Sequence, residues 1–156
     1  MSQTQTQAFE QAEFTLVIER IFDVPREKIW MAWTDHDIRM QWLSPKDFSV
    51  VQDEGCIQTD KAYKACMINS EGKESRYAGE YREVKEPEKL VFTHVWQNDT
   101  CGIPDIETVC TVLLEEIEVG KTKMTFIQTG LRSEDARISH KGGWNECFDK
   151  LQILGK

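Results

Sequence analysis

Residues 14–33, FTLVIERIFDVPREKIWMAW, change abruptly from one kind of secondary structure to another. The first nine of them are rich in branched and aromatic side chains, which favour a β-strand. Pro25 then suits the first turn of a helix, where the amide hydrogen that proline lacks would be unpaired anyway. Ile29, Trp30 and Trp33 recur at the spacing of one helical turn and predict a helix with one buried face.

A second short helix and a run of strands are expected next. Thr34 or Asp35 can cap this helix, and Ser44-Pro45 ends it. In addition to the strand at 14–22, strands are expected at 48–51, 62–69, 75–85, 89–97, 106–119 and 122–129. Gly120-Lys121 between the last two marks a hairpin.

The last element is predicted to be a long helix. Ser133 can cap its N-terminus, and Glu134 and Asp135 suit the positive end of the helix dipole. Apolar side chains then follow helical spacing: Ile138, Trp144, Cys147, Phe148, Leu151 and Leu154. They form the expected buried face of this helix.

This order of elements predicts the α+β class. Adjacent antiparallel strands with helices gathered apart from them are typical of that class. We expect a curved antiparallel sheet of about seven strands wrapped around the long C-terminal helix, with two short helices after the first strand. Residues 1–12 are polar and Gln-rich and are expected to be a disordered tail, which leaves residues 13–156 as a single domain.

Composition and charge exclude several classes of function. The chain has 156 residues, and 19 basic against 27 acidic side chains give a net charge of −8. Residues 80–118 alone carry a net charge of −7. Nucleic acids and anionic membranes attract clusters of Lys and Arg, so neither is an expected partner. No apolar run approaches the roughly 20 residues that a membrane helix needs, so membrane insertion is not expected.

The cysteines and the N-terminus bear on cofactors and location. The five cysteines include no Cys-x-x-Cys pair, so neither a zinc site nor a disulfide framework is expected. The three histidines suggest no metal site either, and no motif for a nucleotide cofactor is present. The first residues lack the pattern of a signal peptide, which together with free thiols predicts a cytoplasmic protein.

Several motifs carry a resemblance to a known family. They are residues 14–25, WLSP at 42–45, GEY at 79–81, EPEKLVF at 86–92 and HKGGW at 140–144. In this order they resemble the START-like (helix-grip, SRPBCC) superfamily, and within it the group named for the C-terminal domain of the heat-shock chaperone ATPase activator. The chain departs from the group at residues 53–56, DEGC, where many members have a pair of glycines.

The resemblance implies the fold described above and a cavity between sheet and helix. In this superfamily the cavity commonly holds lipids, polyketides or other apolar molecules, and a few members are cyclases or hydrolases. Side chains on the faces that would border it are the candidate ligand-binding residues: Tyr77, Tyr81, Phe92, His94, Trp96, Met124, Phe126, Gln128, Gly143, Trp144 and Phe148. Each aromatic among them could instead fill a packed core.

The polar and glycine candidates also have two interpretations. His94 shares a strand face with aromatic residues and could orient a ligand, act as a general base, or be a hydrogen-bonded structural residue. Gln128 is a second polar anchor with the same alternatives. Gly142-Gly143 lies early in the long helix. It either opens the cavity mouth or lets a ligand approach the backbone, or it has a structural role in close packing against a strand or in a bend. No catalytic residue is assigned, because no nucleophile has a base predicted within reach.

Three functions remain open from the sequence. The first is binding of a small apolar or amphipathic ligand. The second is an enzyme of the polyketide cyclase or hydrolase type, which would use His94 with Gln128 or Tyr81. The third is an interaction module that modulates a chaperone ATPase, and a homodimer is also possible.

Overall fold

The computed structural model describes residues 14–97 and 106–154. Within these ranges the elements are β1 (Leu16–Phe22), α2 (Arg26–Thr34), α3 (His36–Trp42), β2 (Phe48–Gly55), β3 (Ala62–Asn69), β4 (Glu74–Lys85), β5 (Lys89–Trp96), β6 (Thr108–Glu118), β7 (Lys121–Thr129) and α4 (Glu134–Leu154). The expected tail at residues 1–12 lies outside the described residues.

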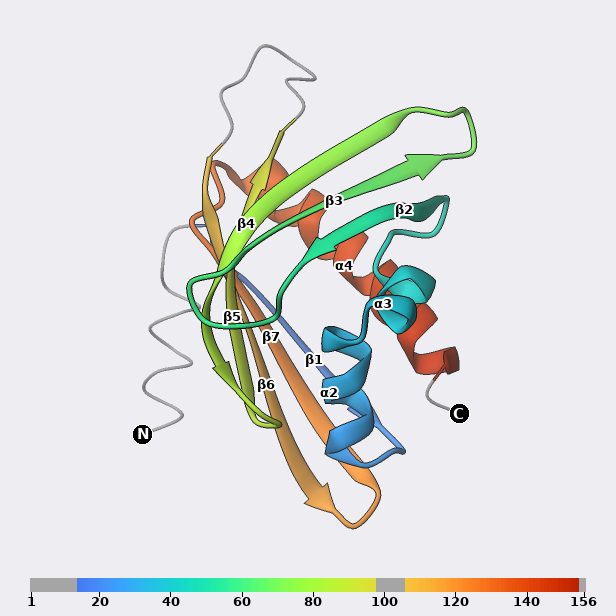
Figure 1. Cartoon of the computed structure of the whole chain (residues 1–156), viewed down its shortest axis with the longest axis vertical. Helices are drawn as coiled ribbons and strands as arrows, with labels where there is room; N and C mark the ends of the chain where they lie inside the picture. The colour runs from blue at the N-terminus through green and yellow to red at the C-terminus, as the bar shows by residue number, and fades with distance from the viewer. Residues whose placement is uncertain (1–13, 98–105, 155–156) are drawn as a thin grey trace.

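The strands form one curled antiparallel sheet. Its order is β1-β7-β6-β5-β4-β3-β2, so β1 and β2 are the two edges of the described sheet. Figure 1 shows the sheet curling around α4, with β2, β3 and β4 arching over one end of the molecule and α2 and α3 lying beside the helix. The α+β class and the helix-grip fold predicted from the sequence are thereby confirmed.

The core is centred on Trp33 of α2. Its ring lies 4.8 Å from that of Trp42, edge to face, and 6.1 Å from that of Phe126 on β7. Phe148 of α4 packs on the same indole at 6.2 Å. The four side chains come from four different elements and are each almost fully buried. The short helices, the sheet and α4 are therefore joined by one aromatic cluster.

Two predicted helix caps are found at the expected places. The Asp35 carboxylate accepts a hydrogen bond from the backbone N–H of Ile38 at 3.1 Å, so Asp35 rather than Thr34 caps α3. Ser133 accepts one from the N–H of Ala136 at 3.0 Å at the start of α4. The apolar stripe of α4 was predicted too long, because Ile138 is 57% exposed.

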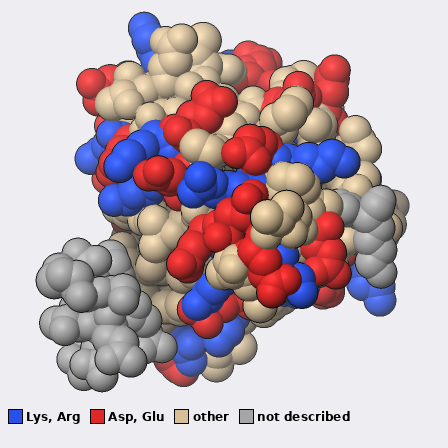
Figure 2. All heavy atoms as spheres, turned by 90° about the horizontal axis from the view of Figure 1, so that it is seen from below, with Lys and Arg blue, Asp and Glu red and all other residues tan. Residues whose placement is uncertain are grey.

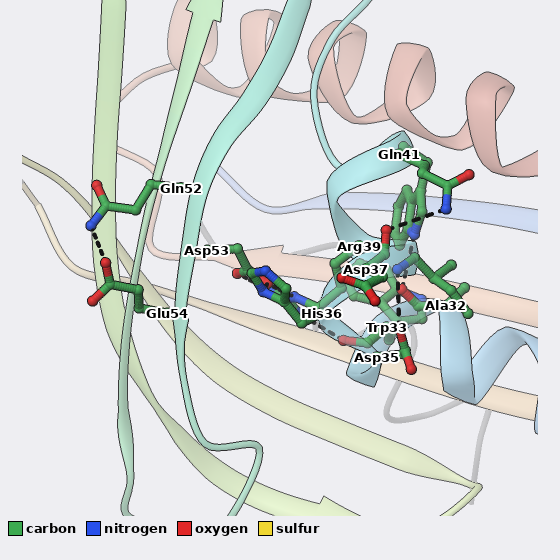
Figure 3. A network of polar contacts seen from close by, with 12 residues as sticks. Ala32, Trp33, Asp35, His36, Asp37, Arg39, Gln41, Gln52, Asp53 and Glu54 are labelled. Carbon is green, nitrogen blue, oxygen red and sulfur yellow. Dashed lines mark hydrogen bonds and ion pairs between the residues drawn. The ribbon is translucent and has the colours of Figure 1, made fainter.

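Strand β2 is longer than predicted because of a β-bulge. The register against β3 shifts between Val50 and Gln52, which reverses the alternation and turns Asp53 toward the same face as Val50. There the Asp53 carboxylate meets Arg39 of α3, with Nε–Oδ2 and Nη2–Oδ1 distances of 3.0 and 3.2 Å. Figure 3 shows Asp53 pointing toward α3, whereas Gln52 points the other way.

This buried ion pair fixes α3 against the sheet edge. Arg39 also donates to the backbone oxygen of Trp33 at 2.6 Å, and His36 approaches the Asp53 carboxylate at 3.2 Å. The side chains of Arg39 and Asp53 are only 5% and 9% exposed. Burial works against the charge of Arg39, but Tyr81 and the Asp53 carboxylate together raise its pKa. The pair lies at the DEGC segment, where the sequence departs from the family pattern.

Candidate functional site

A cavity of about 580 Å³ lies between α4, the β3–β5 part of the sheet and the segment that follows α3. Its walls are Met67, Ser75, Tyr77, His94 and Trp96 on the strands, Leu43, Pro45 and Phe48 around the α3–β2 connection, and Ile138, Ser139, His140, Gly142, Gly143, Trp144, Glu146 and Cys147 on α4. Its volume is within the range of roughly 300–1,000 Å³ that is typical of small-molecule sites.

The sheet wall is a cluster of rings around His94. The imidazole stacks on Tyr77 with ring centroids 4.6 Å apart and meets Trp96 edge to face at 4.9 Å. Strand alternation explains this contact, because His94 and Trp96 share the inward face of β5 and Tyr77 is the register partner of Trp96. His94 is 4% exposed, and its ring makes no side-chain hydrogen bond to any residue that the structure describes.

Burial keeps His94 neutral. Desolvation, with a smaller contribution from the nearby His140, lowers the pKa of His94 to about 3. A neutral imidazole offers one hydrogen-bond donor and one acceptor. The cavity therefore contains a neutral imidazole among aromatic surfaces, which interacts with its own backbone but with no polar group of another described side chain.

His140 is held in one orientation at the edge of the same cluster. Its Nδ1 lies 2.7 Å from the carbonyl oxygen of Ala136, and its Nε2 lies 3.0 Å from the indole nitrogen of Trp96. A carbonyl can only accept and an indole N–H can only donate, so Nδ1 carries the proton and Nε2 accepts. His140 also lines the cavity.

Lys150 fastens to α4 the part of the cavity wall that Leu43, Pro45 and Phe48 form, which we call the α3–β2 wall. The ammonium donates to Ser44 Oγ at 2.9 Å and to the backbone oxygens of Pro45 and Phe48 at 2.9 and 3.0 Å. All three of its donors are used in this way. Desolvation lowers the pKa of this lysine. The segment that forms this wall is thus fixed to α4.

The glycine pair leaves space on the helix wall. A Cβ added to Gly142 would meet no atom within 4 Å, and one added to Gly143 would lie 3.7 Å from Pro45. Neither glycine has the positive φ that only glycine tolerates well. Close packing against a strand, one of the interpretations from the sequence, therefore does not account for Gly142. Both glycines line the cavity.

Five of the candidate residues named from the sequence line the cavity together: Tyr77, His94, Trp96, Gly143 and Trp144. The other six do not: Tyr81, Phe92, Met124, Phe126, Gln128 and Phe148. Each of these six is at most 6% exposed. They share the inward face of the sheet or the buried face of α4, but they are packed within the core and not at the cavity.

Gln128 does not line the cavity, but it holds one of the lining side chains, Trp144, by a hydrogen bond. Its Oε1 accepts a hydrogen bond from the indole N–H of Trp144 at 2.9 Å, and its Nε2 donates to Thr108 Oγ1 at 2.9 Å. Gln128 is fully buried. Its amide therefore sets the orientation of the Trp144 ring, which forms part of the cavity wall.

The lining residues include one thiol, that of Cys147. Burial raises the pKa of the Cys147 thiol to about 12, so it is not a thiolate at neutral pH. Neither of the alternative partners expected for an enzyme that uses His94, Gln128 or Tyr81, lines the cavity. In residues 14–97 and 106–154, no three His, Cys, Asp or Glu side chains are grouped so that they could hold a metal ion.

Reasoning from sequence missed Lys150, Pro45 and Glu146. Lys150 reads as a solvent-exposed lysine of an amphipathic helix, and its partners are about a hundred residues away in the chain. One signal was available for Pro45. It belongs to the WLSP motif, and the HKGGW motif supplies the glycine that it faces.

In the described parts of the acidic segment 80–118, basic side chains pair with acidic ones. Arg82 pairs with Glu80 at 2.9 Å, and Lys89 with Glu83 at 3.2 Å. The face of the molecule shown in Figure 2 has acidic and basic side chains interspersed, without a continuous basic area. None of the helices in the described residues is both long and apolar enough to cross a membrane.

A curled antiparallel sheet that grips a long C-terminal helix, with a cavity between them, defines the helix-grip class of START-like proteins. Residues 23–156 match the family model of the Activator of Hsp90 ATPase homolog 1-like proteins. The chain belongs to this family, which confirms the resemblance seen in its motifs.

Solved structures from several bacteria have the same fold. The AHSA1 protein of Silicibacter pomeroyi is 23% identical with a TM-score of 0.80, and the match covers 90% of this chain and 96% of that one. A protein of Chromobacterium violaceum is 19% identical with a TM-score of 0.78 and the same two coverages, 90% and 96%. One from Mesorhizobium loti is 24% identical with a TM-score of 0.73, covering 90% and 95%. No curated protein matches the sequence.

Proposed function

We propose that this protein binds a small apolar or amphipathic molecule in the cavity between α4 and the sheet. The observation that carries the proposal is the 580 Å³ cavity, whose walls combine aromatic rings with His94, a buried polar group without a side-chain partner among the described residues. Ligand sites are typically apolar with a few polar groups that set the orientation of the ligand. The ligand-binding residues that we propose are Tyr77, His94, Trp96, Gly143 and Trp144.

The test uses a neutral fluorescent probe, N-phenyl-1-naphthylamine, whose emission rises in apolar surroundings. We expect saturable binding of one probe per chain. Gly142→Leu should weaken binding at least tenfold, because its side chain extends from a wall position that now contacts nothing within 4 Å. Lys141→Leu is the matched control, since it adds the same side chain next to the cavity but does not line it.

Both variants are first checked for folding by circular dichroism and thermal unfolding. If the folded Gly142→Leu protein binds the probe as tightly as the unchanged protein, the cavity is not the binding site. If the unchanged protein shows no saturable binding of the probe, the proposed function itself fails.

We place the protein in the cytoplasm. The four cysteines in the described residues, Cys56, Cys66, Cys110 and Cys147, are all free thiols, which supports a reducing compartment.

Contact with a chaperone stays a prediction from the family. Adding the protein at saturating concentration to a chaperone ATPase assay tests it, and an unchanged ATPase rate contradicts it.

A further inference from the structure

We propose that the cavity selects uncharged aromatic molecules that carry a hydroxyl group over carboxylates of the same skeleton. This inference rests on the proposed function and specifies its ligand class. It follows from three features of the walls: their charge, the state of His94 and the shape of the apolar surface.

The charge of the walls opposes an anion. The lining residues in the described chain include one carboxylate, Glu146, and neither lysine nor arginine. Glu146 accepts a hydrogen bond from the backbone N–H of Lys46 at 3.1 Å, which places its charge beside the α3–β2 wall. A ligand carboxylate would meet a like charge at this wall and no lining cation to balance it.

Lys150 does not supply the missing cation. It lies next to the same wall, but its ammonium is shared among the oxygens of Ser44, Pro45 and Phe48 at 2.9–3.0 Å. An ammonium group has three donors, and all of them are occupied here. A ligand carboxylate could pair with Lys150 only if the ammonium gave up its bonds to the α3–β2 connection.

The state of His94 favours a hydroxyl. Buried among the Tyr77 and Trp96 rings, the imidazole is neutral and offers one donor and one acceptor. A hydroxyl group can both donate and accept, so it can pair with whichever nitrogen of His94 faces the cavity. A carboxylate can only accept, and it would favour a protonated imidazole, which the burial of His94 disfavours.

The apolar walls favour a flat ring system. Tyr77, Trp96 and Trp144 line the cavity with aromatic surfaces, and Gln128 fixes the Trp144 indole in place. Aromatic pairs gain free energy beyond that of their buried area when they stack with an offset or meet edge to face. The geometry thus points to a rigid aromatic alcohol or phenol as the class of ligand.

The test is displacement of bound N-phenyl-1-naphthylamine at neutral pH by 2-naphthol, 2-naphthoate and 2-methylnaphthalene. These compounds share one skeleton and differ in the group that would face His94. We expect 2-naphthol to compete at least tenfold better than 2-naphthoate, which corresponds to about 1.4 kcal/mol. We also expect it to compete better than 2-methylnaphthalene.

Two variants test whether the charge of Glu146 and the imidazole of His94 cause the differences in competition among the three compounds. Glu146→Gln keeps an acceptor for the Lys46 N–H but removes the charge, so 2-naphthoate should compete several-fold better. His94→Phe keeps a ring at the position but removes both hydrogen-bonding groups, so 2-naphthol should lose its advantage over 2-methylnaphthalene.

The outcomes separate this inference from the proposed function. If the unchanged protein binds the probe and 2-naphthoate competes as well as 2-naphthol, the selection is overturned and the binding function stands. This comparison needs no variant, so it holds even if His94→Phe does not fold. If the probe is not bound at all, both proposals fail.

Discussion

The indole N–H of Trp96 donates a hydrogen bond to Nε2 of His140 across 3.0 Å, between β5 and α4. Because Nδ1 of the same ring donates to the Ala136 carbonyl, this bond exists only while the imidazole is neutral. A proton added at Nε2 would place two donors against each other. The contact between sheet and helix at the cavity edge therefore depends on pH.

The first prediction concerns the pH at which this contact breaks. Burial, with a smaller contribution from Arg132, lowers the pKa of His140 below its ordinary value of 6.5. We expect the indole N–H signal of Trp96 in ¹⁵N-resolved NMR, assigned with Trp96→Phe, to shift with a midpoint below pH 6.5. A midpoint at or above 6.5 would contradict the lowered pKa, and a signal independent of pH down to the onset of unfolding would contradict the bond.

The second prediction concerns acid stability through His94. Its pKa is lowered to about 3, whereas the unfolded chain has an ordinary histidine that binds a proton below 6.5. The stabilising effect of a neutral His94 is thus complete above pH 6.5. It is lost between pH 6.5 and about 3, at a rate of at most about 1.4 kcal/mol per pH unit.

Urea unfolding at a series of pH values checks this. The matched variant is His94→Phe, whose ring does not titrate, and its free energy of unfolding should fall less steeply between pH 6.5 and 4 than that of the unchanged protein. Equal slopes for the two proteins would rule out His94 as a source of the acid sensitivity.

The third prediction concerns the fastening of the α3–β2 wall. Lys150→Met removes three charge-assisted hydrogen bonds and should lower the free energy of unfolding by about 2 kcal/mol. Backbone amides of residues 46–48 should exchange their hydrogens faster. Lys141→Met is the control, because Lys141 is on the same helix but its side chain makes no hydrogen bond to a described residue. Similar losses in both variants would mean that the three bonds contribute nothing specific.

The fourth prediction concerns the effect of the glycine at position 142 on the stability of α4. Gly142→Ala should raise the free energy of unfolding by up to about 1 kcal/mol, because alanine is the better helix former and its Cβ would meet no atom within 4 Å. Gly120→Ala also adds a methyl group in open space, but φ there is +75° and the change should destabilise. Thermal unfolding of the two variants gives the comparison, and a shift of the same sign in both would contradict it.

The fifth prediction tests the buried ion pair of Figure 3. Asp53→Ala leaves the Arg39 charge buried without its partner carboxylate and should cost about 3 kcal/mol or more. Arg39→Met with Asp53→Leu removes both charges and should recover most of that loss. Urea unfolding measures both proteins, and a double variant no more stable than Asp53→Ala would show that the pair acts through more than its charges.

Much of the fold could be predicted because alternation and caps are local properties. Period-two alternation placed Phe92, His94 and Trp96 on one face of β5, and that face does point inward. The extension of β2 could not be predicted in this way, because the bulge after Val50 reverses the alternation and Asp53 is satisfied by a residue on another element.

The candidate site was harder to predict than the fold. Alternation indicates which face of a strand a side chain lies on, but not whether that part of the face borders a cavity or the packed core. Phe92 and His94 are neighbours on the same face, yet Phe92 packs 6.0 Å from Trp33 in the core and His94 lines the cavity. The difference depends on where α4 touches the sheet, and Phe148 marks that contact. Distances between elements of this kind are not encoded in the spacing of residues along one strand.

The open space at Gly142 also has a consequence for how the protein can change over generations. A single-nucleotide change can turn a glycine codon into one for alanine, serine or valine, each of which would extend a different volume and polarity from this position. Since an added Cβ would meet no atom within 4 Å, such changes would alter the shape and polarity of the cavity wall without repacking the core. The cavity can therefore drift in shape while the fold remains intact.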